Sequence, residues 1–383
     1  MTVCLDLNDH KRTFPQSNKD KMLSILALLL LAFWSPTAHT VSLGRFPVSI
    51  TSAQLNDIAR LDPFAPKPQH RTFMVSIFEL VEHDCKAISS PYMPPLTAAY
   101  EDAKFSAYGV PEGTFPDLTI KVCQPTTKPL SNQRTNKVVL FSGALGTSRY
   151  LYSALIATVA SRGYTIIAVD HPYDTDIVEF PSGKTIIGLN LTDEQIPLAV
   201  ETRARDLSFV LDHLSRTTKS CPGRPIQAVA FSHSLGGAAA IAALRDPRIL
   251  GALNLDGSVF GPAVNASTNK PVLLFGHDGK NRTTDPTWGE LWPHLSGWKA
   301  EVELVGSAHY SFSDWPVIAD EVFGGVENLP AEAAELIGKI GGERMTEILG
   351  SYVTAFLTLS FGGKIDGLLK GESKRFPEVL FLE

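Results

Sequence analysis

From residue 137 onward, short apolar stretches alternate with longer stretches in which apolar residues recur every three or four positions. The short stretches are almost continuously hydrophobic, which is typical of strands buried on both faces of a sheet. We expect strands over residues 137–141, 164–169, 226–231, 252–255, 271–275 and 300–305. The helical periodicity predicts helices over residues 149–162, 197–214, 235–244 and 343–359.

This alternation predicts an α/β protein with a mainly parallel central sheet and helices on both faces. Because crossovers between parallel strands are right-handed, the loops that follow the strands gather at the carboxyl edge of the sheet. Sites of α/β proteins form at that edge. Polar residues that directly follow the predicted strands are therefore the first candidates for chemistry.

The region before this alternation, residues 41–136, is rich in proline and turn residues. It contains two strand-like stretches, residues 72–78 and 118–122. The stretch 91–95 (PYMPP) predicts an irregular loop that buries its aromatic residue. We interpret the region as the decorated N-terminal part of a single domain that spans residues 41–383.

The first forty residues have the features of a secretory signal peptide. Residues 22–34 form an apolar run that follows Lys19 and Lys21 and precedes Pro36 and several small residues. A basic flank, a short apolar core and a small-residue exit are typical of such peptides, and the run is short for a bilayer span. An uncleaved membrane anchor is the alternative interpretation, and both Met1 and Met22 are candidate start residues.

Secretion changes what the cysteines and asparagines predict. In an oxidising compartment, two of the three cysteines that remain after cleavage would pair. We favour a disulfide between Cys85 and Cys123, which both precede the regular alternation that begins at residue 137, and expect Cys221 to be unpaired. Three glycosylation sequons, which agree with an extracellular protein, begin at Asn190, Asn265 and Asn281.

Composition excludes several classes of protein. The chain has 383 residues, of which 44% are hydrophobic and 19% charged, so it can bury a large core and is not mainly disordered. The net charge is −6, and removal of residues 1–40 makes the chain slightly more acidic. Because phosphate binding needs a basic surface, a nucleic-acid partner is not expected.

A candidate nucleophile lies in the segment AVAFSHSLGGAAA, which predicts a strand, a sharp turn and a small-residue helix. Its centre, Ser232-His233-Ser234-Leu235-Gly236, follows the pattern G-x-S-x-G with serine in place of the first glycine. In a nucleophile elbow these flanking residues are small so that strand and helix can approach each other. Ser234 is therefore the predicted nucleophile, while Ser232 lies on the strand side of the turn.

A serine nucleophile needs a base, and His309 is the candidate. It lies in VGSAHYSFSDW, just after the last predicted parallel strand, where hydrolases with the chain order Ser…Asp…His supply their base. Three other histidines are expected to have structural roles. His171 is expected to lie at the rim of the pocket. His233 is expected to point away from the acyl site, and His277 occupies a position where an acid is more usual than a base.

The acid has two candidates from the residue pattern. Asp256 ends the strand ALNLD, and Asp278 follows the next strand in FGHDGKN. The acid would hold the imidazole in the required tautomer and stabilise the imidazolium. Many hydrolases of this type place the acid after the later of these two strands, so pattern alone slightly favours Asp278, and both positions stay open.

An oxyanion hole needs backbone N–H groups directed at the developing alkoxide. One donor is expected from Leu235, the residue after the nucleophile. The second is expected from the loop after strand 137–141, which reads SGALG over residues 142–146. Small residues in that loop let the backbone approach the substrate, and Leu145 is the predicted donor.

Taken together, the segments LFSGALGTSRYLYSALIATVASRGYTIIAVDHPYD, FSHSLGG, ALNLDG and GSAHYSFSDW resemble the secreted platelet-activating-factor acetylhydrolase family of α/β hydrolases. The resemblance runs from about residue 70 to the end of the chain. Its specific parts are the H-x-x-F-x-D segment that begins at His309 and the oxyanion loop. It implies an acid on the earlier strand, which moves the prediction from Asp278 to Asp256. It also implies water as the acyl acceptor, with no metal and no cofactor.

Two positions depart from the family pattern. Ser232 stands where the family usually has glycine, and Gly143-Ala144 stand where the family tends to have His-Gly. Neither departure removes a catalytic group.

The resulting functional hypothesis is a secreted serine esterase that acts on short-acyl esters, with sn-2 acetyl phospholipids as the expected substrates. The alternatives are a cutinase-like or general carboxylesterase and a non-catalytic interaction protein with a hydrolase fold. The tryptophans around the base are expected to pack in the core more than to contact substrate; they are Trp288, Trp292, Trp298 and Trp315. Peripheral contact with a lipid surface is compatible with this hypothesis, and the sequence gives no indication of the oligomeric state.

Overall fold

The computed structural model describes residues 39–41, 47–81, 85–125, 136–217 and 225–383. The expected signal peptide, except residues 39 and 40, and Cys221 lie outside these described residues. Residues 38–383 form one compact unit. Among the described residues, no helix combines the length and the apolar character needed to cross a bilayer.

The core of this unit is a mainly parallel sheet with the strand order β14-β13-β12-β11-β10-β6-β7-β3-β2 in the described part of the chain. The parallel strands are β6 (Lys137–Ser142), β7 (Ile166–Asp170), β10 (Gln227–His233), β11 (Ile249–Leu255), β12 (Val272–His277) and β13 (Lys299–Leu304). The antiparallel strands are β14 (Val379–Phe381) at one edge and β3 (His70–Leu80) and β2 (Val48–Leu61) at the other.

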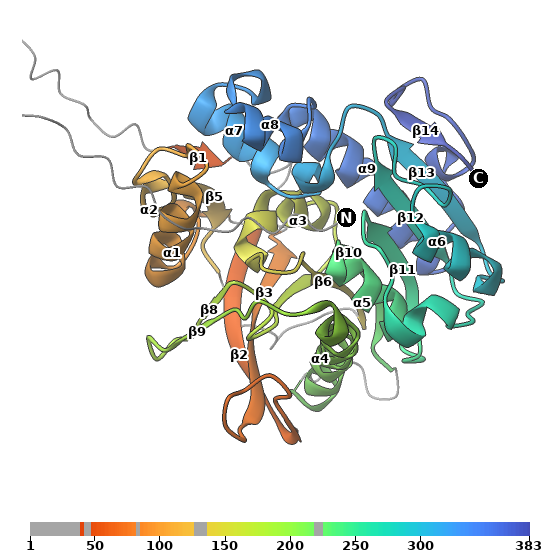
Figure 1. Cartoon of the computed structure of the whole chain (residues 1–383), viewed down its shortest axis with the longest axis horizontal. Coiled ribbons are helices and arrows are strands. Elements are labelled where there is room, and N and C mark those ends of the chain that lie inside the picture. Colours follow the sequence, from red (N-terminus) through yellow and green to blue (C-terminus); the bar gives the residue numbers. More distant parts are fainter. Residues whose placement is uncertain (1–38, 42–46, 82–84, 126–135, 218–224) are drawn as a thin grey trace, which may run out of the picture. The chain divides into compact units, whose positions relative to one another are not determined.

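Helices cover both faces of the sheet because alternate residues of its strands point to opposite faces. In β6, Val139 and Phe141 belong to one hydrophobic cluster, whereas Val138 and Leu140 belong to the other. Helices α3 (Ser153–Ala160) and α9 (Gly342–Ser360) pack on the first cluster. Helices α4 (Ile196–Thr217), α5 (Leu235–Ala243) and α6 (Pro286–Leu291) pack on the second (Figure 1). The predicted α/β architecture is thus confirmed.

The strands and helices predicted after residue 137 are all present, with one difference. The segment predicted as a helix over 149–162 begins as a 3-10 turn over Arg149–Tyr152, and α3 follows it. The side chain of Ser148 accepts a hydrogen bond from the N–H of Tyr150 and so caps this first turn.

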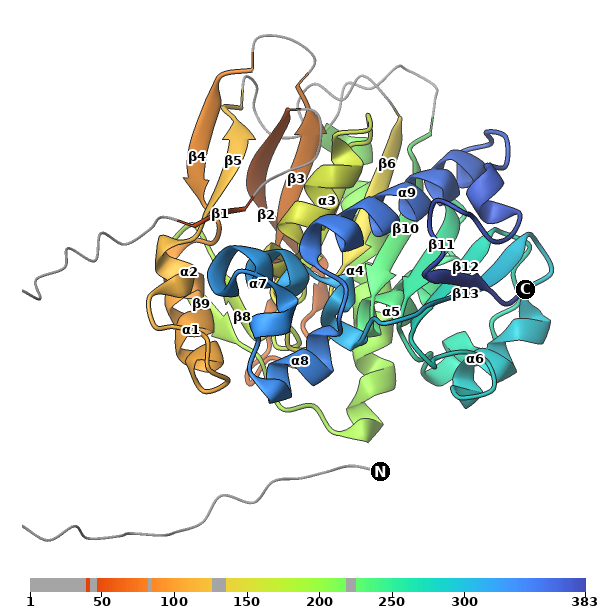
Figure 2. The same ribbon diagram turned by 90° about the horizontal axis from the view of Figure 1, so that it is seen from above.

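The N-terminal region contains more regular structure than its composition predicts. The two expected strands are present as β3 and β5 (Thr119–Cys123), but β2 was missed. A small second sheet has the order β1-β5-β4, with β1 (Thr40–Val41) and β4 (Ala87–Pro91), and lies beside α1 (Pro95–Ser106) and α2 (Thr114–Asp117) (Figure 2). Tyr92, in the expected irregular loop, is buried as predicted.

The predicted disulfide is confirmed. Cys85 and Cys123 are bonded across 38 residues of sequence, and Cys123 is the last residue of β5. The bond joins the segment just before β4 to the end of β5, so it links the two neighbouring strands of the small second sheet.

A two-stranded hairpin and two helices after the base were not predicted. Strands β8 (Ile177–Glu179) and β9 (Thr185–Ile187) form a hairpin after β7. Helices α7 (Trp315–Phe323) and α8 (Ala331–Ile337) follow the predicted base and lie near α1 in Figure 2.

Candidate active site

The predicted nucleophile lies on a strained turn between β10 and α5. Ser234 has φ 56° and ψ −125°, a backbone conformation that non-glycine residues rarely adopt. Such strain persists only where the surrounding structure enforces it, and it concentrates at functional sites. The turn lifts the Ser234 side chain out of the sheet at its carboxyl edge, as a nucleophile elbow requires.

Two glycines make this turn possible. A Cβ atom added to Gly236 would lie 2.0 Å from the carbonyl oxygen of Ser142, at the start of the oxyanion loop. A Cβ atom added to Gly237 would lie 1.9 Å from the side-chain oxygen of Asn254. The first turn of α5 therefore approaches its neighbours so closely that neither position has room for a side chain.

The serine that replaces the first glycine of the elbow has a defined partner. The Ser232 hydroxyl is fully buried and accepts a hydrogen bond of 3.1 Å from the N–H of Ser142. This bond joins the end of β6 to β10 just before the nucleophile. The departure from the family pattern thus adds a link between the nucleophile strand and the oxyanion loop.

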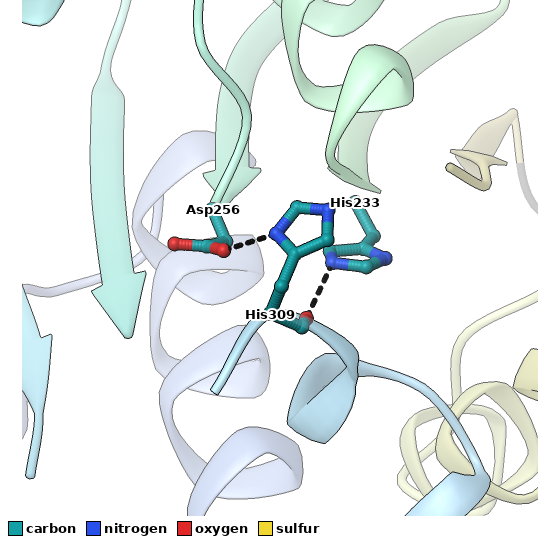
Figure 3. Close-up of side chains that lie close together, drawn as sticks. All are labelled: His233, Asp256 and His309. Carbon is teal, nitrogen blue, oxygen red and sulfur yellow. Dashed lines mark hydrogen bonds and ion pairs between the residues drawn. The ribbon is translucent and has the colours of Figure 1, made fainter. Parts of the chain in front are cut away.

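The structure brings the predicted base and Asp256 to the nucleophile. His309 Nε2 lies 3.0 Å from Ser234 Oγ, and His309 Nδ1 hydrogen-bonds the Asp256 carboxylate (Figure 3). Because an ionised carboxylate only accepts, Nδ1 carries the proton, and Nε2 is left to accept from the serine hydroxyl. This is the arrangement by which a Ser–His–Asp triad transfers a proton.

Asp256 is held as an anion by more than one donor. Burial alone would raise the pKa of this carboxyl, but hydrogen bonds from His277 and His309 and the charge of Lys280 hold that pKa well below its ordinary value. His277 Nδ1 lies 2.7 Å from Asp256 Oδ1, and the N–H of His277 donates to the same oxygen at 3.0 Å. His277 was expected only to be structural, and it is a direct support of the acid.

The other acid candidate lies elsewhere. Asp278 is exposed, and its carboxylate accepts a hydrogen bond of 2.8 Å from the N–H of Gly306. Within the described residues it makes no hydrogen bond to His309. The geometry therefore favours Asp256, the position implied by the family resemblance, over Asp278, the position slightly favoured by pattern alone.

His233 points away from the acyl site, as expected, and links two loops. Its Nε2 donates a hydrogen bond of 2.9 Å to the backbone carbonyl of His309 (Figure 3). Its Nδ1 therefore accepts from the Tyr152 hydroxyl, which lies 3.0 Å away. The same hydroxyl accepts the N–H of Ala144 at 2.9 Å. A buried chain of hydrogen bonds thus runs from the oxyanion loop to the base.

The H-x-x-F-x-D segment anchors the base at its other end. Asp314 accepts hydrogen bonds from the N–H groups of Ala154 and Leu155, at 2.7 and 3.1 Å, in the first turn of α3. It also accepts a hydrogen bond of 2.6 Å from the Tyr92 hydroxyl. These bonds tie the loop that carries His309 to α3 and to the N-terminal region.

The backbone N–H groups predicted for the oxyanion hole have no partner within the described part of the chain. Ala144 donates to Tyr152 and Gly146 donates to the carbonyl of Asp174, whereas the N–H groups of Leu145 and Leu235 donate to no protein group there. The side chains of Leu145 and Leu235 belong to one hydrophobic cluster, so the two loops lie together. Both N–H groups are thus available to a substrate oxygen.

The expectation for His171 needs a correction. It is 1% exposed and therefore does not line the rim of a pocket. Its Nδ1 donates to the Asp206 carboxylate at 2.9 Å, and its Nε2 accepts from the Ser142 hydroxyl at 2.9 Å. His171 instead supports the oxyanion loop, because its buried ring bonds the Ser142 hydroxyl at the start of that loop.

The possible metal ligands at the site are engaged with one another. The ligating atoms of His233, Asp256 and His309 lie within 4.8 Å of one another. Two of the three pairs are joined through hydrogen bonds to His309, one to its ring and one to its backbone carbonyl. A cation would need deprotonated ligand atoms that all point at one position. Here the ring nitrogens donate hydrogen bonds instead, an arrangement that suits proton transfer.

Comparison with known proteins agrees with the geometry. A family profile described as "Platelet-activating factor acetylhydrolase, isoform II" matches residues 115–180. A "Probable 1-alkyl-2-acetylglycerophosphocholine esterase" of Arthroderma benhamiae is 33% identical over 366 residues, which cover 89% of this chain and 92% of that protein. The chain belongs to the platelet-activating factor acetylhydrolase family. Within this family, the "Platelet-activating factor acetylhydrolase" of Cavia porcellus is 23% identical over 277 residues, covering 64% of this chain and 62% of that protein.

The solved structures extend the likeness to other esterases. A ferulic acid esterase from Streptomyces cinnamoneus matches with a TM-score of 0.72 and 29% identity, over 90% of this chain and all of that one. This family member therefore has the α/β-hydrolase fold and is a carboxylic ester hydrolase, as the sequence predicted.

The two acid candidates give a direct test. We expect Asp256→Asn to lower kcat by about 10⁴-fold, because an amide cannot hold the imidazole in the required tautomer. Asp278→Asn keeps an acceptor for the Gly306 N–H and should retain activity near that of the wild type. Steady-state hydrolysis of an activated acetyl ester by both variants measures the contrast. A loss confined to Asp278→Asn would reverse the assignment.

The buried imidazole of His233 predicts a pH dependence of stability. Burial and the nearby His309 lower the pKa of His233 well below its ordinary value. The unfolded chain binds a proton here below about pH 6.5, whereas the folded chain does not, so stability falls as the pH decreases through that value. We expect the urea midpoint to drop between about pH 7.5 and pH 5.5, and to drop less in His233→Gln.

An exposed histidine provides the control for this measurement. His70→Gln should retain the pH dependence of the wild type, because His70 is on the surface. Equal pH dependence in wild type and His233→Gln would contradict the prediction.

Proposed function

We propose that this chain is a secreted serine esterase that hydrolyses short-acyl esters, with the sn-2 acetyl ester of an ether phospholipid as the expected substrate. The observation that carries the proposal is the contact of Ser234 Oγ with His309 Nε2, at 3.0 Å, on a strained turn. The name of the Arthroderma relative supports the acetyl phospholipid as substrate.

In the proposed mechanism, Ser234 attacks the ester carbonyl while His309 accepts its proton. The N–H groups of Leu145 and Leu235 donate to the tetrahedral oxyanion, and Asp256 stabilises the imidazolium. His309 then donates the proton to the departing alcohol. Water, activated by the same imidazole, attacks the acyl-enzyme and releases the acid.

An apolar cavity beside the base supports a substrate with a hydrocarbon portion. It has a volume of about 150 Å³ and is lined by carbon-rich residues that include Phe105, Tyr108, Trp315 and Leu336. Tyr310 also lines it, and its ring centre lies 5.4 Å from that of His309. The Tyr310 ring therefore contacts both the cavity and the surroundings of the base. Of the four tryptophans, Trp288 and Trp292 are buried in the core, and Trp315 is buried but contributes to the cavity wall.

A second candidate function is hydrolysis of aromatic-acyl esters. The likeness to a ferulic acid esterase over the whole of that chain favours it, and a cavity with several aromatic walls is compatible with a planar acyl group. The two candidates share the triad and differ in the acyl group that the site accepts.

A panel of esters tests the activity and the substrate together. We expect the wild type to hydrolyse acetyl esters, including an sn-2 acetyl phospholipid, faster than long-chain or feruloyl esters. Ser234→Ala should lose about 10⁴-fold or more in kcat on every substrate and should not react with a fluorophosphonate probe. Ser182→Ala, at an exposed serine before β9, is the matched control.

The outcomes of this panel separate the candidates. Preference for feruloyl esters would favour the second function over the first. Full activity in Ser234→Ala would overturn Ser234 as the nucleophile. A wild type that neither hydrolyses esters nor reacts with the probe would leave the non-catalytic interpretation.

Secretion is part of the proposal and is supported by the disulfide and by two of the sequons. Asn190 and Asn265 are exposed, whereas the Asn281 amide donates to Glu303 and accepts from Thr283. In a eukaryotic host we expect the protein in the medium, without residues 1–40. Its mass should decrease after deglycosylation, and Asn190→Gln and Asn265→Gln should each remove one glycan. Retention of the uncleaved chain in the membrane fraction would support an anchor instead.

A further inference from the structure

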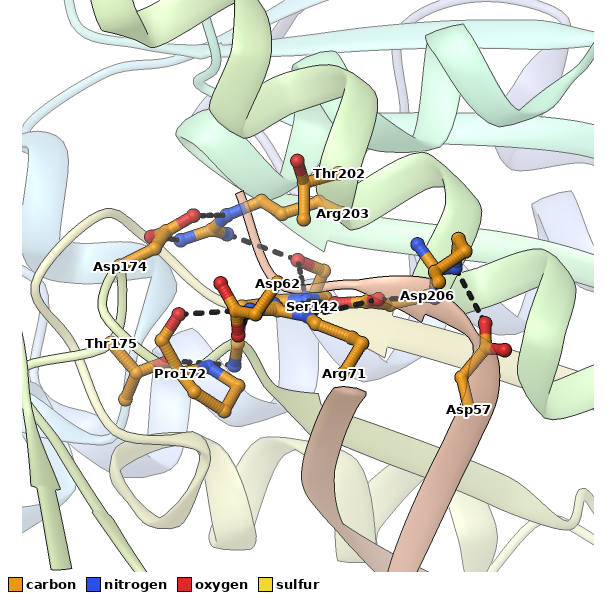
Figure 4. Close-up of polar contacts among 12 residues, drawn as sticks. Asp57, Asp62, Arg71, Ser142, Pro172, Asp174, Thr175, Thr202, Arg203 and Asp206 are labelled. Carbon is orange, nitrogen blue, oxygen red and sulfur yellow. Dashed lines mark hydrogen bonds and ion pairs between the residues drawn. The ribbon is translucent and has the colours of Figure 1, made fainter. Parts of the chain in front are cut away.

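One buried arginine contacts the oxyanion loop at several points. Arg203 lies on α4 and is 1% exposed. Its Nε donates to Asp174 Oδ2 at 2.6 Å. Its Nη2 donates to the other oxygen of the same carboxylate. This bidentate pair fixes the plane of the guanidinium and balances its charge. Figure 4 shows Arg203 between Asp174 and Ser142.

The remaining donors of Arg203 all reach the oxyanion loop. Nη1 donates to the Ser142 hydroxyl at 3.0 Å and to the carbonyl of Gly143, and Nη2 donates to the carbonyl of Ala144 at 3.2 Å. A guanidinium has five N–H donors, and all five have a partner here.

The bond to the Ala144 carbonyl orients the predicted oxyanion donor. The Ala144 carbonyl and the Leu145 N–H belong to one peptide group, which is planar and trans. The two therefore point in opposite directions. Because Arg203 holds the carbonyl on the side of α4, the N–H of Leu145 points to the opposite side, where it has no protein partner in the described chain.

The preceding peptide group, between Gly143 and Ala144, has a hydrogen-bond partner for both its carbonyl and its N–H. Arg203 holds the Gly143 carbonyl, and the N–H of Ala144 donates to Tyr152. A Cβ atom on Gly143 would lie 2.6 Å from the Tyr152 ring, so the loop is clamped between Arg203 and Tyr152. Among residues 144–146, only Leu145 has an N–H with no partner in the part of the chain that the structure describes.

We propose that Arg203 is a positioning residue that directs the Leu145 N–H at the substrate oxyanion. This inference rests on the proposed function. Arg203 does not contact the reacting atoms, and its charge is paired with Asp174, so it acts through the orientation of one peptide group. Lysine cannot replace it. The planar guanidinium bonds Asp174 and three acceptors of the loop at the same time, whereas an ammonium has only three donors and no planar fork.

The test compares an ester with its thionoester, in which sulfur replaces the carbonyl oxygen. Sulfur accepts hydrogen bonds weakly, so an intact oxyanion hole favours the oxygen substrate. We expect Arg203→Lys to lower kcat for the ester by roughly 10²-fold, the effect of losing one oxyanion donor, with a smaller change in KM. The thionoester rate should change much less, so the ratio of the two rates should fall about tenfold or more.

A second multiply bonded arginine provides the matched control. Arg248 directly precedes β11, at the edge of the sheet opposite the catalytic site, and bonds Asp212, Asp246 and the Ser208 carbonyl, none of which belongs to the oxyanion loop. Arg248→Lys should lower the urea midpoint while keeping the wild-type ratio of ester to thionoester rates. If Arg203→Lys does not fold, Asp174→Asn, which keeps the guanidinium but weakens its anchor, should lower the same ratio.

The possible results are distinguishable. An unchanged ratio in Arg203→Lys, or an equal fall of the ratio in Arg248→Lys, would overturn the positioning role. Failure of the proposed function would be seen separately, as an active Ser234→Ala variant or an inactive wild type.

Discussion

The close approach of α5 to the carboxyl edge of the sheet is the constraint on which the site depends. Gly236 leaves no room for a Cβ atom against the Ser142 carbonyl, and Gly237 leaves none against Asn254. This contact forces Ser234 into its positive-φ conformation and places the nucleophile turn directly beside the oxyanion loop. The buried alanines that follow in α5 continue the same close packing onto the sheet.

Buried polar groups hold the loops around this turn in place. A connected chain of hydrogen bonds and ion pairs runs beneath the oxyanion loop through Asp62, Arg71, Asp206, His171, Ser142, Arg203 and Asp174. Removing charges from water is costly, and such pairs are tolerated only where their donors and acceptors are matched. The matching here fixes the geometry of the loops, which is the property that an oxyanion hole requires.

Periodicity in the sequence predicted the parallel strands and their helices well, because each strand is buried on both faces and is continuously apolar. It missed β2, whose outer residues are exposed at the sheet edge, and α1, which is polar and begins after prolines. Ser234, His309 and Leu235 could be selected from their positions after strands. The choice between Asp256 and Asp278 could not be made from spacing, because both follow strands that end at the same edge. His277, Tyr152 and Arg203 could not be identified, since their partners are distant in sequence and only the fold brings them together.

The walls of the apolar cavity come from α1, α7, α8 and the turn at Tyr310, whereas the triad and the oxyanion loop are attached to the central sheet. The catalytic groups and most of the cavity walls thus lie in different parts of the chain. Substitutions at Tyr108 and Leu336, two lining residues that make no hydrogen bond to the oxyanion loop or to the turn of His309 in the described chain, can alter the shape of the cavity. This separation offers a physical route by which esterases with the same catalytic framework diverge toward different acyl groups.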